Sequence, residues 1–164
     1  MKGKRVALYG VLTALAMVLS YVETFIPLFA AVPGVKLGLT NIAVLFALYR
    51  LGLRGAAAVS LVRVMLSAIL FGNAFSLAYS LAGACVSLAV MALLRRCGRF
   101  SVMGVSVAGG AAHNLAQIAV AAIALNTAGL LGYLPVLIVS GTAAGVCVGA
   151  AAAVLIKRVD PKIK

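Results

Sequence analysis

Residues 102–125 read VMGVSVAGGAAHNLAQIAVAAIAL, an apolar run that contains no charged side chain. An α-helix rises about 1.5 Å per residue, so this run is long enough to cross the ~30 Å hydrocarbon core of a bilayer. Further apolar segments lie on both sides of it. Together they predict six membrane spans, at about residues 6–26, 38–49, 55–71, 74–94, 102–125 and 131–156.

The composition excludes a soluble enzyme. Of the 164 residues, 65% are hydrophobic and 10% are charged, whereas soluble domains carry about 25% charged residues. The only acids are Glu23 and Asp160, too few for catalysis by paired carboxylates. We therefore expect an all-α integral membrane protein without enzymatic activity. Its fold would be a six-helix transmembrane bundle that forms a single domain over residues 1–164.

The basic residues predict the orientation of the chain in the membrane. The net charge is +12, and every basic residue except Lys36 and Arg63 lies near a terminus or in the connections 50–54 and 95–101. An excess of Lys and Arg in such connections is typical of cytoplasmic loops. We therefore expect both the N and C termini to be cytoplasmic. Nucleic acid is not an expected partner, because a nucleic-acid-binding protein gathers its basic residues on one folded face.

Ionisable and amide side chains within the spans point to a functional site, because such groups are costly in a bilayer. Arg63 lies midway along the third span, and its partner is either Glu23 or a bound anion. His113 and Gln117 are four residues apart in the fifth span, so they share a helix face. The structural alternatives are a simple Arg63–Glu23 ion pair and a histidine that is satisfied within the core.

The polar residues of the middle and outer parts of the spans predict one outward-facing pocket for a polar or anionic ligand. They are Glu23, Lys36, Asn41, Arg63, Asn73, His113, Asn114 and Gln117. The Pro- and Gly-rich connection 27–38 would be either an ordinary external loop or a lid over this pocket. One His and one Glu do not make a metal-ligand set, and no nucleotide-binding motif is present. No metal and no cofactor are therefore expected.

Small residues at four-residue spacing let membrane helices approach closely. The sixth span carries Gly141, Gly145 and Gly149 at this spacing, which predicts internal packing. The first span carries a similar set, Ala7, Gly10 and Ala14. That set either packs internally or contacts a helix of a partner membrane protein.

Five ordered motifs resemble a bacterial membrane family that is labelled both the Gx transporter family and heptaprenyl diphosphate synthase component I. The motifs are SYVETFIP (20–27), PGVKLGLTN (33–41), VRVMLSAILFGN (62–73), AHNLAQ (112–117) and YLPVL (133–137). The resemblance covers nearly the whole chain. The family is similar in size and layout to the substrate-binding S components of energy-coupling factor (ECF) transporters.

The similarity to ECF S components implies a substrate-binding subunit of a small-molecule uptake system in the bacterial cytoplasmic membrane. Its partners would be a membrane coupling subunit, in contact with Ala7, Gly10 and Ala14, and ATPases. The alternative is a non-catalytic membrane accessory subunit of a polyprenyl diphosphate synthase or of quinone- or flavin-linked electron-transfer machinery. The chain lacks an aspartate-rich motif for magnesium diphosphate chemistry, so the synthase label would describe an accessory subunit.

Overall fold

The computed structural model describes residues 2–25, 38–72 and 74–159, and all regular structure in these ranges is helical. The elements are α1 (Lys2–Thr24), α2 (Asn41–Phe71), α3 (Ala74–Cys97), α4 (Val102–Ala124), the 3-10 helix η1 (Ala128–Tyr133) and α5 (Leu134–Val159). All five α-helices are long and apolar enough to cross a membrane. The expectation of an all-helical membrane protein is thereby confirmed.

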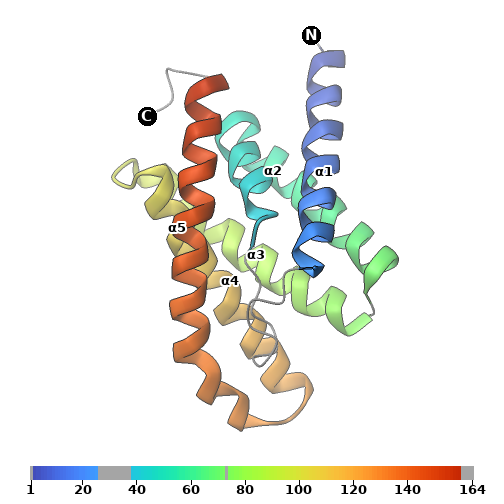
Figure 1. The fold of residues 1–164 in the computed structure, drawn as a ribbon, viewed down its shortest axis with the longest axis vertical. Coiled ribbons are helices and arrows are strands. Elements are labelled where there is room, and N and C mark those ends of the chain that lie inside the picture. The colour runs from blue at the N-terminus through green and yellow to red at the C-terminus, as the bar shows by residue number, and fades with distance from the viewer. Residues whose placement is uncertain (1, 26–37, 73, 160–164) are drawn as a thin grey trace.

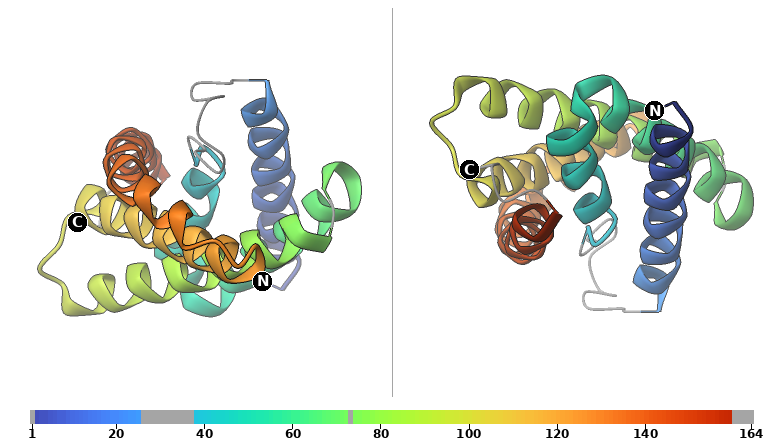
Figure 2. Two further views of the ribbon diagram at one scale, coloured as in Figure 1. Left: turned by 90° about the horizontal axis from the view of Figure 1, so that it is seen from below. Right: turned by 90° about the horizontal axis from the view of Figure 1, so that it is seen from above.

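The helices pack around α2 and α4. Helix α2 lies between α1 and α5 and contacts both, while α4 packs along α3 on one side and along α5 on the other (Figures 1 and 2). Figure 1 also shows that α1 begins and α5 ends at the same end of the molecule. This arrangement leaves much of α1 without a protein neighbour.

Helix α2 differs from the prediction, because it contains both the second and the third predicted spans. The two segments meet at Gly52, where φ is +77° and ψ is −176°. Glycine reaches positive φ without steric cost, so the chain changes direction here within one residue and then continues as a helix. The described residues therefore form five α-helices rather than six, and α2 has a first half (41–51) and a second half (53–71).

The first half of α2 is the centre of the hydrophobic core. Every residue from 43 to 49 is buried, and this segment packs with Leu12 of α1, Met91 of α3 and Ile156 of α5. A helix that is apolar on all sides is typical of complete burial. Because protein surrounds this short segment, it does not have to cross the bilayer by itself.

Arg95, in the last turn of α3, binds the C-terminal end of this central segment. Its guanidinium donates hydrogen bonds to the carbonyl oxygens of Leu48 and, at 3.2 Å, of Tyr49, and it also lies 4.9 Å from the centre of the Tyr49 ring. Cations stabilise the carbonyl end of a helix. Arg95 therefore joins α3 to the turn of α2 that precedes the break at Gly52.

Glycines allow the backbones of α4 and α5 to touch. A Cβ atom added at Gly145 would lie 2.6 Å from Cα of Val107, and one added at Gly110 would lie 2.5 Å from the carbonyl oxygen of Gly141. A Cβ atom at Gly149 would similarly meet the backbone of α4. The predicted packing role of Gly141, Gly145 and Gly149 is thereby confirmed.

We expect Gly145→Ala to destabilise the protein by about 1–3 kcal/mol, because the added methyl group meets backbone that cannot rotate away. Gly10→Ala is the matched control, since Gly10 also lies within a helix but has nothing within 4 Å of an added Cβ. The measurement is thermal unfolding of the purified protein in detergent. Equal midpoints for the two variants would contradict this account of the α4–α5 contact.

Arg95→Gln is expected to lower stability by about 1–2 kcal/mol, because it removes charge-assisted hydrogen bonds at a half-buried position. Arg96→Gln is the control, since the neighbouring Arg96 is exposed and an exposed cation contributes little. The two variants are compared by measuring how much folded protein each loses during stepwise denaturation in detergent. If Arg96→Gln is the more harmful change, Arg95 does not hold the end of the central segment.

Candidate functional site

One polar pocket gathers most of the residues that the sequence predicted as a site. Six of the eight line it, from three helices: Glu23 at the end of α1, Asn41 and Arg63 on α2, and His113, Asn114 and Gln117 on α4. The other two, Lys36 and Asn73, lie outside the described residues, as does nearly all of the 27–38 connection. Whether the six residues bind a ligand remains a prediction.

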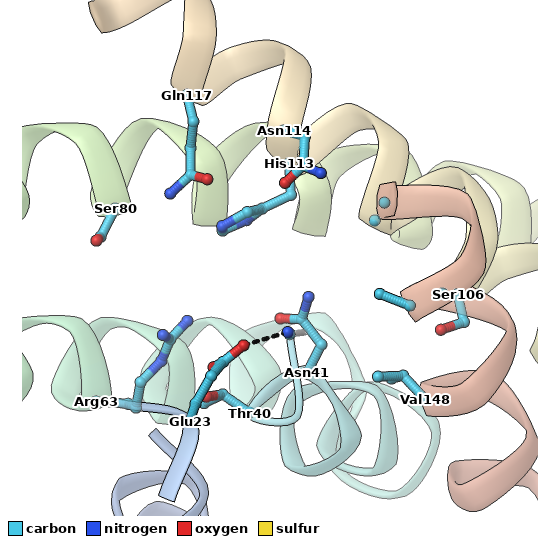
Figure 3. Close-up of a pocket in the computed structure, with 15 residues that line it drawn as sticks. Glu23, Thr40, Asn41, Arg63, Ser80, Ser106, His113, Asn114, Gln117 and Val148 are labelled. Atoms are coloured by element: carbon cyan, nitrogen blue, oxygen red, sulfur yellow. Dashed lines mark hydrogen bonds between the residues drawn. The ribbon is translucent and has the colours of Figure 1, made fainter. Parts of the chain in front are cut away.

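The pocket has two facing walls. Figure 3 shows Gln117 and His113 pointing from α4 toward the side chains of Arg63, Glu23 and Asn41 on the opposite side. The cavity volume is about 40 Å³, and a water molecule needs about 10–15 Å³ on the same measure. The pocket is partly open and small, with room for a few waters or one compact molecule.

Glu23 and Arg63 lie together in this pocket. Oε1 of Glu23 accepts a hydrogen bond from the backbone N–H of Gly38, where φ is +68° (Figure 3). The side chain of Arg63 lines the same cavity. The two opposite charges therefore share one pocket, and an ion pair between them stays a prediction.

Three hydrogen-bonding atoms of the pocket are buried and have no partner among the described residues. They are Nε of Arg63, Oγ1 of Thr40 and Oε1 of Gln117. Thr40 is 2% exposed and Gln117 is 1% exposed. A buried polar atom without a hydrogen bond costs about 1–3 kcal/mol. Three such atoms in one pocket therefore indicate a site where a bound ligand or water would supply the missing hydrogen bonds.

Asn114 has a structural role as well as a place in the pocket. Its Nδ2 donates a 2.8 Å hydrogen bond to the carbonyl oxygen of Leu137, and an added Cβ at Gly141 would lie 2.7 Å from the same nitrogen. The amide therefore joins α4 to α5. Its oxygen and the second hydrogen of Nδ2 are left for a ligand.

Some residues of the site were not predicted from the sequence. The hydroxyl groups of Ser80 and Ser106 line the pocket. Gly83 of α3 supports it, because a Cβ atom there would lie 2.8 Å from Cε1 of His113 and 2.9 Å from Cγ of Gln117. Serine and glycine are common in apolar helices, so none of these positions stands out in the sequence.

The predicted partner contact lies apart from the pocket. Ala7, Gly10 and Ala14 are all exposed on α1. This face is open rather than packed internally, and no residue within the described ranges covers Gly10. As to metals, the described part of the chain contains no group of three or more His, Cys, Asp or Glu residues that could hold an ion.

The chain matches a known protein family over most of its length. The sequence profile of the family described as heptaprenyl diphosphate synthase component I matches residues 12–155. The chain belongs to this family. The component I match includes every pocket residue described above and all five helices in whole or in part. No curated protein and no solved structure is significantly similar to the chain.

A double-mutant cycle tests the Glu23–Arg63 pairing in this component I protein. Glu23→Gln and Arg63→Met should each destabilise the protein, because each leaves the other charge without its counterpart. The double variant should lose less stability than the sum of the two, with a coupling of about 0.5–3 kcal/mol. The measurement is the unfolding midpoint, in detergent, of the wild type, the two single variants and the double variant. Additive losses would show that the two side chains do not depend on each other.

Proposed function

We propose that this chain is a non-catalytic membrane subunit that binds a small polar molecule in the pocket and acts together with a separate prenyl diphosphate synthase component. The observation that carries the proposal is the convergence of the unpaired, buried atoms of Arg63, Thr40 and Gln117 on one pocket. Family membership supports the choice of partner.

The proposal of a non-catalytic role rests on the small number of carboxylates. Prenyl diphosphate chemistry relies on Mg²⁺ to hold phosphate oxygens, and Mg²⁺ binds to proteins through carboxylates. The chain has two acids, Glu23 and Asp160. Glu23 already accepts a hydrogen bond from Gly38 and shares the pocket with the positive charge of Arg63. The reaction would therefore take place on the partner.

The proposed orientation has both termini and the connections 50–54 and 95–101 in the cytoplasm of a bacterial cell, with the pocket on the outer side of the cytoplasmic membrane. The distribution of basic residues supports it, as does the meeting of the first residues of α1 and the last residues of α5 at one end of the molecule (Figure 1).

A second candidate function is the substrate-binding subunit of an ECF-like uptake system. The specific observation in its favour is the open face of small residues on α1, namely Ala7, Gly10 and Ala14. Such a face suits close contact with a helix of another membrane protein. In this case the partners would be a membrane coupling subunit and ATPases, and the same pocket would hold the transported solute.

Purification from native membranes distinguishes the two assemblies. A tagged chain, extracted in mild detergent, is expected to bring with it a soluble prenyl diphosphate synthase component. Gly10→Leu places a large side chain on the open face of α1 and tests whether that face makes the contact. Co-purification of a coupling subunit and ATPases without a synthase would favour the uptake system instead.

Ligand binding is tested by native mass spectrometry of the same preparation. The wild-type chain should carry a small molecule, and Gln117→Leu should reduce its occupancy about tenfold, the equivalent of one lost buried hydrogen bond. Leu115→Ala is the control, because Leu115 lies on the same helix with 48% of its surface exposed. A wild-type chain without any bound molecule, and with no response to either variant, would contradict the binding role.

A further inference from the structure

We propose that the pocket selects a ligand of zero net charge that presents a carbonyl oxygen and an N–H group together, as a lactam or cyclic imide does. This inference rests on the proposed function, because it specifies what the ligand-binding pocket recognises. It follows from the charges and hydrogen-bonding atoms of the described lining residues.

The two acid–base side chains of opposite charge in the described lining offset each other. Among the described residues of the pocket, Arg63 contributes a positive charge and Glu23 a negative one. Opposite charges that share one cavity attract each other. An anionic ligand would add an uncompensated charge to a half-buried site within a membrane protein, which is costly. A neutral ligand leaves the balance unchanged.

The hydrogen-bonding atoms that remain after this pairing are of two opposite kinds. Nε of Arg63 is a donor without an acceptor, and Oε1 of Gln117 is an acceptor without a donor. The hydroxyl of Thr40 can serve in either role. A ligand that satisfies all of them must therefore accept a hydrogen bond at one position and donate one at another. A carboxylate or phosphate without a proton offers acceptors alone and leaves Gln117 unsatisfied.

The geometry requires both groups on one compact molecule. Arg63 and Gln117 reach into the pocket from opposite walls (Figure 3), and the cavity volume is about 40 Å³. The described lining includes no Phe or Tyr, and its flat groups are the imidazole of His113 and the guanidinium of Arg63. A lactam carries its C=O and N–H along one edge, where both walls can form hydrogen bonds with it.

A further amide of the pocket lies near Gln117 on α4. Nδ2 of Asn114 uses one of its two hydrogens on the carbonyl oxygen of Leu137, which leaves the other hydrogen and the side-chain oxygen for further partners. Gly83 holds Gln117 close against α3, since no Cβ atom fits between them. The polar side chains of α4 are therefore held on a rigid, closely packed surface.

Four probes test the inference by equilibrium dialysis against the full chain in lipid nanodiscs. Uracil is neutral and carries C=O and N–H groups, and N,N′-dimethyluracil keeps the carbonyls but has no N–H. Orotate adds a negative charge to the uracil ring, and inorganic phosphate is an anion without a ring. We expect uracil to bind about tenfold or more tightly than each of the other three, because each of them leaves a buried atom unpaired or unbalances the charge.

Glu23→Gln gives an independent test of the charge balance, because it keeps the shape of the side chain and raises the net charge of the pocket by one. The ratio of orotate binding to uracil binding should rise at least about tenfold in this variant. Arg96→Gln, which alters an exposed charge outside the pocket, should leave the ratio unchanged. If Glu23→Gln does not fold, the ranking of the four probes on the wild-type chain still decides whether the pocket prefers a neutral ligand.

The outcomes separate this inference from the proposed function. Tighter binding of orotate or phosphate than of uracil, or equal binding of uracil and its dimethyl derivative, would overturn the inference and leave a ligand-binding subunit. Binding of none of the four probes to the wild-type chain would count against the pocket as a binding site, and both proposals would fall.

Discussion

The buried first half of α2 is the element on which both ends of the molecule depend. Residues 43–49 are buried within the protein, so the polar groups at both ends of this segment have to be satisfied by protein. At the C-terminal end, the backbone changes direction at Gly52, and Arg95 donates hydrogen bonds to the carbonyls of the last turn. At the N-terminal end, the backbone N–H groups of residues 41–44 bond the carbonyls of residues 38–40, and Gly38 donates to Glu23. The site thus lies at the N-terminal end of the central helix, where Oγ1 of Thr40 has no partner among the described residues.

Helix α4 determines how narrow that site is. It packs closely on two neighbours, with Gly83 of α3 on one side and Gly141 of α5 on the other. His113, Asn114 and Gln117 lie in the part of α4 between these contacts. The polar side chains are therefore held where the backbones come closest. A larger residue at either glycine would move them, so the packing of the helices and the geometry of the pocket cannot change independently.

The sequence located the apolar segments and most of the residues that line the pocket, for related reasons, but it divided α2 into two spans. Apolar runs are easy to locate in a membrane protein, and polar side chains within them are costly enough to stand out. Six of the eight predicted residues line one pocket for this reason, although their binding role remains a prediction. Ser80, Ser106 and Gly83 could not be found, because serine and glycine cost little in an apolar helix. The role of Arg95 was also hidden, since in the sequence it is one of several basic residues in a connection, and its acceptors lie on another helix.

The surroundings of Glu23 relate the pocket to the proposal that the reaction takes place on a partner protein. An enzyme that handles diphosphates needs free carboxylates for Mg²⁺, whereas here the one acid among the described pocket residues lies in the same cavity as Arg63 and accepts a hydrogen bond from the N–H of Gly38. That arrangement makes a guanidinium tolerable within a membrane protein. It also removes the carboxylate from metal chemistry. The same side chain therefore favours a pocket that recognises a ligand through hydrogen bonds and disfavours one that transforms it, which is what a binding subunit of a two-component system requires.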